Sequence, residues 1–358
     1  MPSEAATTIE IDAKGGRGRY RALIWRRQLI LAGLSVALVF SFCVDLALGP
    51  AQYGLDDVVQ GLLMPDAVPL QVRVVLWEIR MPIALMAIVV GAALAVAGAQ
   101  MQTILNNPLA SPFTLGISAA ASFGAALALA FGVAFIPAAI GYVVPANAFV
   151  MAMLAALLIH LLSARRGVTV ETVVLLGIAM VFTFNALLAL VQFFASTEAL
   201  SAVVFWTMGS LIKATWPKLG VTALVFAAVL PVFVRRAWAL TALRLGEDKA
   251  ASLGVKVRRL RLETLMLVSL LAAIPVAFVG TIGFIGLVGP HIARMLIGED
   301  QRFFLPASAL SGALILSLSS VVSKSLIPGT IFPIGVVTSL IGIPFFVSLI
   351  LSRPGRAS

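Results

Sequence analysis

The sequence predicts an all-α integral membrane protein with about ten transmembrane helices and both ends in the cytoplasm. Of its 358 residues, 61% are hydrophobic and 11% are charged, whereas a soluble domain carries about 25% charged residues. Apolar runs long enough to cross a bilayer, about 20 residues each, recur along the chain. Lys and Arg gather between these runs, as they do in cytoplasmic loops of membrane proteins.

The apolar runs divide the chain into an N-terminal arm, one ten-helix domain and a short tail. Residues 1–27 form a basic arm, which we expect to be flexible because Gly15, Gly16 and Gly18 disfavour a helix. The domain occupies 28–353, and 354–358 is a cytoplasmic tail. Predicted spans lie near 28–48, 80–101, 112–132, 143–163, 172–195, 218–240, 262–280, 282–297, 304–325 and 335–352. The eighth is short and rich in glycine, so we do not expect it to cross as one regular helix.

The placement of the basic residues sets the orientation. With the N-terminus inside, the Lys and Arg on the outer side are Arg73, Arg80, Lys213, Lys218 and Lys324, and all others of the 25 fall inside. This asymmetry agrees with the positive-inside rule. The net charge of +10 is therefore explained by topology, and no nucleic-acid partner is expected.

A glycine-rich run near the C-terminal third points to transport. Gly283, Gly286, Gly289 and Pro290 interrupt an apolar segment, and broken backbone at membrane depth is tolerated where it is buried in protein or lines a wet cavity. Asn107 and Pro108 interrupt the chain between the second and third spans in a similar way, with a tight turn as the plain alternative.

The cytoplasmic loop near 241–259 contains a short helical stretch from about Glu247 to Leu253, between Gly246 and Gly254. Ala250 and Leu253 on its surface, beside Leu245, could fit a groove on a partner subunit. The alternative is an ordinary solvated basic loop.

The chain shows no pattern typical of catalysis or of a metal site. His160 and His291 stand alone, Cys43 is the single cysteine, and there is no phosphate-binding loop for hydrolysing ATP. Acidic residues fall near span ends, which disfavours an ion-coupled carrier. A channel or such a carrier remains the alternative from another class, with a membrane-embedded enzyme third.

Several motifs occur in one order along residues 30–353. They are Arg80-Met81-Pro82, Asn107-Pro108-Leu109-Ala110, Leu245-Gly246-Glu247 with Leu253-Gly254, and the segment from Gly283 to Arg294. In this the chain resembles the FecCD/BtuC-type permeases of bacterial ABC importers for iron–siderophore complexes, haem and vitamin B12.

The resemblance implies a BtuC-like type II importer domain in the bacterial inner membrane, with no cofactor bound by this chain. Its implied partners are two ATP-binding subunits that use ATP-Mg, a second permease copy or paralogue, and a periplasmic or lipoprotein substrate-binding protein. An iron–siderophore chelate is the favoured cargo because it is the commonest in the family, with haem and vitamin B12 as alternatives.

The resemblance also implies roles for particular residues. Residues 245–254 look like the helix that docks on the ATPase. Arg80 and Lys324 match two outer cations that pair with glutamates of the binding protein. The fifth span looks like the gating helix, with the candidate gate and pathway residues Thr169, Thr172, Asn185 and Gln192.

Overall fold

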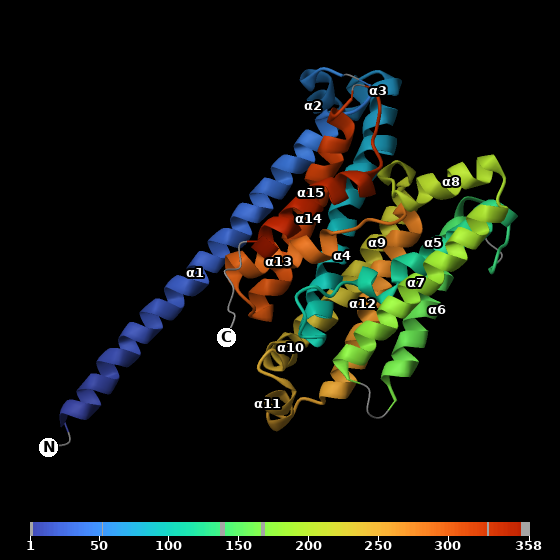
Figure 1. Cartoon of the computed structure of the whole chain (residues 1–358). Helices are drawn as coiled ribbons and strands as arrows, with labels where there is room; N and C mark the ends of the chain where they lie inside the picture. The colour runs from blue at the N-terminus through green and yellow to red at the C-terminus, as the bar shows by residue number, and fades with distance from the viewer. Residues whose placement is uncertain (1–2, 52, 137–139, 166–168, 328, 352–358) are drawn as a thin grey trace.

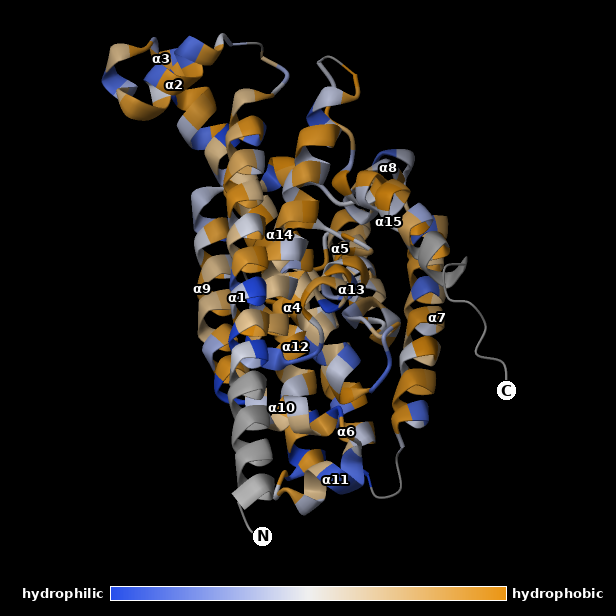
Figure 2. Ribbon diagram, turned by 90° about the vertical axis from the view of Figure 1, so that its left-hand side faces the viewer, coloured by the Kyte–Doolittle hydropathy of each residue, from blue (hydrophilic) through white to orange (hydrophobic). Residues whose placement is uncertain are grey.

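The computed structural model describes residues 3–51, 53–136, 140–165, 169–327 and 329–351, and within these ranges the only β pairing is an isolated bridge between Ile327 and Thr330. Helices run between two polar ends (Figures 1 and 2). One end carries α2 (Leu55–Leu63) and α3 (Leu70–Val74), and the other carries α10 (Ala237–Leu243) and α11 (Glu247–Ser252). The predicted all-α membrane fold is confirmed.

Ten apolar helices lie between these ends, in positions that match the ten predicted spans. Seven are long and apolar enough to cross a membrane, and α5, α13 and α15 are shorter apolar helices. The ten are α1 (Ser3–Ala47), α4 (Met81–Ile104), α5 (Ile117–Phe131), α6 (Val143–Ser163), α7 (Val170–Phe194), α9 (Trp216–Arg235), α12 (Val257–Val279), α13 (Ile285–Ile297), α14 (Gln301–Ser325) and α15 (Ile334–Leu351). The outer helix α8 (Thr197–Thr207) follows α7.

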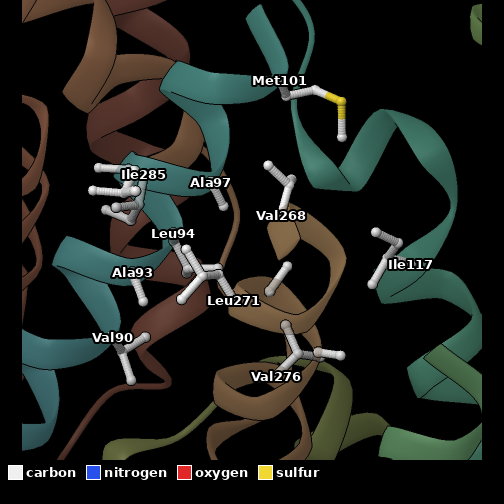
Figure 3. Packing of buried hydrophobic residues seen from close by; sticks show 14 of the residues in the cluster. Val90, Ala93, Leu94, Ala97, Met101, Ile117, Val268, Leu271, Val276 and Ile285 are labelled. Carbon is white, nitrogen blue, oxygen red and sulfur yellow. The ribbon is translucent and has the colours of Figure 1, made fainter. Parts of the chain in front are cut away.

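The core is built around α4, which continues without a break from α3 through one π-helical turn, Val75–Arg80. Val90, Ala93 and Leu94 of α4 face Val268 and Leu271 of α12 in the packed interior (Figure 3). These positions are largely small or branched, so the helices approach closely and the contact consists of van der Waals packing.

Glycines set the closest approaches of α4. A Cβ atom on Gly98 would lie 1.8 Å from the carbonyl oxygen of Gly286 in α13, and one on Gly91 would lie 2.4 Å from that of Gly312 in α14. Neither contact leaves room for a methyl group, because the obstructing atoms belong to backbone. The small-residue face of α4 therefore joins α13 and α14 to the core.

The structure differs from the sequence-based expectations in three helices. First, α1 begins at Ser3, so the arm that we expected to be flexible continues the first span as helix. Each glycine costs a helix only about 1 kcal/mol relative to alanine, and the adjoining span supplies the helical turns on which the arm extends.

The other two differences concern the sixth and eighth spans. The sixth, expected as one run from 218 to 240, ends at Arg235, and α10 begins at Ala237 after a residue with non-helical backbone, Arg236. The eighth, which we did not expect to cross as one regular helix, is regular throughout 13 residues that include Gly286, Gly289 and Pro290, but it is shorter than the about 20 residues that cross a bilayer. Packing against α4 overrides the low helix propensity of these residues.

Candidate functional site

The candidate site is the cytoplasmic segment around α11, which projects from the end of the bundle (Figure 1). The predicted helix from about Glu247 to Leu253 is observed as Glu247–Ser252. Gly246 has φ +104° and Gly254 has φ +84°, values that residues with a Cβ rarely adopt. The two glycines therefore let the chain leave the bundle, form one short helix and return.

The exposed surface of this segment is apolar at both ends of the helix. Leu245 is 60% exposed and Leu253 is 52% exposed. Ala250, in contrast, is fully buried, so its predicted place on the docking surface is wrong. Such a short helix buries one face against the rest of the protein, and Ala250 lies on that face. The backbone N–H of Val255 donates a hydrogen bond to the Ala250 carbonyl (3.0 Å), so the chain turns back after the helix.

Ion pairs connect this segment to the bundle. Arg244, three residues before the start of α11, donates from Nε to Oε2 of Glu299 (3.1 Å) and from Nη1 to Oδ1 of Asn106 (3.2 Å). From the first turns of α12, Arg261 binds both Glu247, the first residue of α11, and the Ile104 carbonyl. The start of α11 is thus held by two arginines that also bind residues at the C-terminal end of α4.

The connection continues inward through Glu299. Arg294 of α13 lies 2.9 Å from the same carboxylate and donates from Nη2 to Oε1 of Gln102 (2.8 Å). Gln102 Nε2 in turn lies 3.4 Å from the Gly286 carbonyl. Pro290 has no N–H to give that carbonyl its helical bond, so the buried amide of Gln102 serves as the donor instead.

The network was not predicted from the sequence. Glu299 follows α13 in a loop, and neither its position nor that of Arg244 forms a motif with Gln102. The available signal was the pair Gln100 and Gln102 in the otherwise apolar α4, since polar side chains inside a membrane helix are costly and need partners. Gln100 donates to Gln301 (2.9 Å), which supports that reasoning.

The helix-interrupting motifs have structural roles. Asn107 Oδ1 accepts a hydrogen bond from the Leu109 N–H (2.9 Å) in the turn that follows α4, and Pro108 lies within that turn. Gly283 precedes α13 in a non-helical link. Gly289 faces Ala95 of α4, where a Cβ would meet the alanine methyl at 2.9 Å. The run from Gly283 to Pro290 therefore serves the close packing of α13 against α4.

The two predicted docking cations are buried, so their assignment to a binding-protein surface is wrong. Arg80 is 4% exposed and donates to the carbonyls of Leu46 and Ala47 at the end of α1 (2.8 and 3.0 Å). Lys324 is 8% exposed and forms an ion pair with Asp45. Both positive charges are used inside the chain, because the loss of hydration on burial must be offset by partners.

The predicted gate residues lie along α7. Thr169 caps that helix, with its Oγ1 accepting from the Thr172 N–H (3.4 Å). Asn185 is exposed and Gln192 is half-buried, on an otherwise apolar helix. None of the four lines the nearby cavity of about 440 Å³, whose polar lining includes Thr207, Thr281 and Ser339. The structure thus separates the α7 residues from that cavity.

Comparison with known proteins gives consistent matches over nearly the whole chain. The sequence model of the FecCD transport family matches residues 37–352. A putative ABC transporter permease protein of Methanocaldococcus jannaschii is 40% identical over 92% of this chain and 94% of its own. The hemin transport system permease protein HmuU of Yersinia pestis is 36% identical over 78% of this chain and 84% of its own.

A solved structure agrees with the fold. It is described as an inward-facing conformation of a putative metal-chelate type ABC transporter, and it superposes with a TM-score of 0.78 at 31% identity, covering 91% of this chain and 99% of its own. Relatives named for molybdate and vitamin B12 import match to a similar extent. The cargoes in these names differ, while the architecture is shared.

Proposed function

This chain belongs to the FecCD transport family and is a permease of the ABC importer type, and from that premise we propose that it imports an iron–siderophore chelate with energy from separate ATP-binding subunits. The cargo proposal is supported by the similarity to a metal-chelate type transporter. Haem is the second candidate, because a hemin permease is among the relatives, and vitamin B12 is a third.

The α11 segment is the observation that carries the coupling part of the proposal. It presents two exposed leucines, Leu245 and Leu253, on the end of the bundle that carries most of the cationic loops. Exposed apolar side chains on a short projecting helix suit a groove on a partner. Through Arg244 and Glu299, a displacement of this helix acts directly on α4 and α13.

The partners follow from this arrangement. Two ATPases that use ATP-Mg would each hold one α11 segment, and closing them on ATP would move the two segments together. A second permease, identical or paralogous, would cover the apolar side of α7, where Phe182 and Phe193 are 71% and 80% exposed. The translocation pathway would then lie between the two α7 helices, near Asn185 and Gln192.

A binding protein on the outer side is the remaining partner. Since Arg80 and Lys324 are buried, its contacts must come from other outer residues. The α2–α3 region is the most prominent candidate, because it forms the outer end of the molecule and carries the exposed charges Asp56, Asp57, Asp66 and Arg73 (Figure 1). Complementary charge on the binding protein would guide association more than it adds affinity.

The coupling proposal is tested by changing the α11 surface in the reconstituted transporter. Gly246→Pro with Glu247→Lys should abolish ATP-driven uptake while the protein still inserts, because proline cannot adopt φ +104°. Leu253→Glu is a milder variant that changes surface alone, and Leu23→Glu on α1, where the leucine is likewise 52% exposed, is its matched control. Normal uptake by Leu253→Glu and by the double variant would refute the coupling role.

The cargo is tested separately. Proteoliposomes that contain the transporter, its ATPase and its binding protein would be given a ferric siderophore, haem or cobalamin in parallel. We expect ATP-dependent accumulation of the ferric siderophore. Accumulation of haem or cobalamin alone would show that the proposed cargo is wrong but would leave the assignment as a permease intact. Uptake driven by an ion gradient without ATP would contradict the proposal that ATP supplies the energy.

A further inference from the structure

The cavity of about 440 Å³ near α7 has no part in the network around Glu299. The end of α8, the link between α12 and α13, and the start of α15 line it, together with Phe113 of the 3₁₀ turn η3 (Pro112–Leu115). Among the described residues, Phe113 is the one aromatic in the lining and no charged side chain contributes to it. The volume falls in the range of small-molecule sites, about 300–1,000 Å³. The cavity is therefore large enough for part of a cargo molecule and makes no ion pair with it.

The three elements that contribute most of the lining form one rigid wall. The N–H of Gly335, at the start of α15, donates to the carbonyl of Met208 after α8 (3.0 Å). A Cβ atom on Gly335 would lie 2.4 Å from the same carbonyl oxygen. The N–H of Ser210 donates to the carbonyl of Val279 at the end of α12 (2.6 Å). Backbone contacts thus hold α8, α12 and α15 in a fixed arrangement on this side of the cavity.

The polar groups of this wall are hydroxyls that can still accept hydrogen bonds. Thr207 donates to the Val204 carbonyl (2.8 Å), Ser339 donates to the Gly335 carbonyl (2.7 Å), and Thr281 donates to the Thr207 carbonyl. A hydroxyl has one donor and two acceptor lone pairs, so these oxygens remain open to an N–H or O–H group of a cargo. Weak contacts of this kind suit a pathway, because a solute that binds there must also be able to leave.

Phe113 comes from a different part of the chain, and its turn is packed tightly on α7. A Cβ atom on Gly177 of α7 would lie 2.5 Å from the carbonyl oxygen of Thr114. Gly116, which follows η3 with φ +77°, lies so close to α7 that a Cβ on it would be 2.9 Å from the Cβ of Met180. These contacts involve backbone or Cβ atoms, which cannot move aside as the tip of a long side chain can. A displacement of α7 is therefore passed on to η3.

The other end of η3 contacts α13, the helix that the coupling network holds. The Cδ atom of Pro112 lies 3.7 Å from the position of a Cβ on Gly286. The carbonyl of Gly286 is bound by Gln102, which Arg294 binds in turn. Since η3 touches α13 at its start and α7 at its end, a relative displacement of these two helices turns it. Phe113 lines the cavity from this junction.

We propose that Phe113 is a gate of the transport pathway, whose ring narrows the cavity beside Thr281 and Ser339 in one state of the cycle and withdraws in another. This role rests on the proposed function, in which α7 lines the pathway and α11 drives the cycle. A phenylalanine that served packing alone would be buried like Leu115, which is 1% exposed. Phe113 is only half-buried and has the cavity beside it, so its ring has space into which to move.

The test measures thiol labelling on the rigid wall. In a Cys43→Ser background, Ser339→Cys in proteoliposomes with the ATPase and the binding protein is treated with a charged thiol reagent, with and without ATP. The labelling rate should change about fivefold or more, the lower end of usual coupling effects, because the ring controls access of water and reagent to the thiol. Phe113→Ala removes the ring, so its rates with and without ATP should be equal.

Three further variants guard against a loss of folding. Phe113→Tyr keeps the ring and should keep the ATP effect. Phe113→Leu keeps part of the bulk and should give an intermediate effect. Phe131→Ala at the end of α5, where the ring is 49% exposed, is the matched control and should label as the parent does.

A reporter on α7 separates this proposal from the proposed function. Asn185→Cys should show an ATP-dependent labelling rate both with Phe113 and with Phe113→Ala, because α7 moves in either case. If Asn185→Cys responds to ATP but Ser339→Cys does not, or if Phe113→Ala keeps the response at Ser339→Cys, the gate is overturned and the proposed function stands. Equal rates with and without ATP at both positions overturn both.

Discussion

Lys324 of α14 and Asp45 of α1 form a buried ion pair, with 2.9 Å between Nζ and Oδ1. Asp45 is fully buried, and its other carboxylate oxygen accepts a hydrogen bond from Ser320 (3.2 Å). Arg80 binds the adjoining end of α1 through its carbonyl groups. The outer end of α1 is therefore fastened to the core by the same two cations that the sequence suggested for docking.

Removing one partner of this pair should destabilise the protein strongly. Lys324→Met would leave the Asp45 carboxylate buried without its counter-charge, which typically costs about 3–5 kcal/mol. Lys324→Met combined with Asp45→Leu should recover most of that loss. Thermal unfolding of the detergent-solubilised protein measures both, and a single variant as stable as the wild type would contradict the burial of this pair.

Glu299 should matter more for coupling than for folding. Glu299→Gln removes the charge that joins Arg244 to Arg294, so motion of α11 would be passed on less effectively to α13. We expect the amount of cargo imported per ATP hydrolysed to fall about fivefold or more, within the usual range of coupling energies. Glu198→Gln, which removes an exposed carboxylate at the start of α8, is the control and should leave this ratio unchanged.

Gly98 should tolerate no side chain at all. Gly98→Ala would drive a methyl group into the carbonyl of Gly286, at 1.8 Å without relaxation, and overpacking of this kind costs about 1–3 kcal/mol or more. The yield of monodisperse protein in size-exclusion chromatography should drop sharply. Gly220→Ala in α9, where nothing lies within 4 Å, should be neutral or slightly stabilising.

Asn185 and Gln192 should face water in at least one state of the transport cycle. In a Cys43→Ser background, Asn185→Cys and Gln192→Cys should react with a charged, membrane-impermeant thiol reagent, because only a hydrated thiol ionises readily. The labelling rate should change when ATP is added. Leu158→Cys on the lipid-facing side of α6 is the control, and equal, ATP-independent rates at all three positions would remove α7 from the pathway.

Asp300 should make stability depend on pH in the acid range. Hydrogen bonds from Arg302 hold the pKa of Asp300 below its ordinary value of 3.8. The stabilisation is thus present above the unfolded-state pKa and is lost as the pH falls through the lower folded-state pKa. Asp300→Asn keeps the cap of α14 but removes the charge, so its melting temperature should lie below that of the wild type near neutral pH and converge with it in acid.

The sequence determined the features that depend on local composition. Apolar length gave the ten helices, the distribution of Lys and Arg gave the orientation, and Gly246 and Gly254 gave the short helix between them, because each of these follows from the properties of neighbouring residues. The sequence was also enough to recognise the family, because the motifs that carry the resemblance are short runs of neighbouring residues in a fixed order.

Only the tertiary structure decided how distant residues use one another. It placed Arg80 and Lys324 against the end of α1, because a cation near a span end is stabilised as well by a buried carboxylate or carbonyl as by water, and sequence spacing does not distinguish the two. It packed the glycine-rich run from Gly283 to Pro290 closely against α4, and it brought Glu299 between Arg244 and Arg294. Such contacts join residues far apart in the chain, and their geometry exists only once the helices have packed.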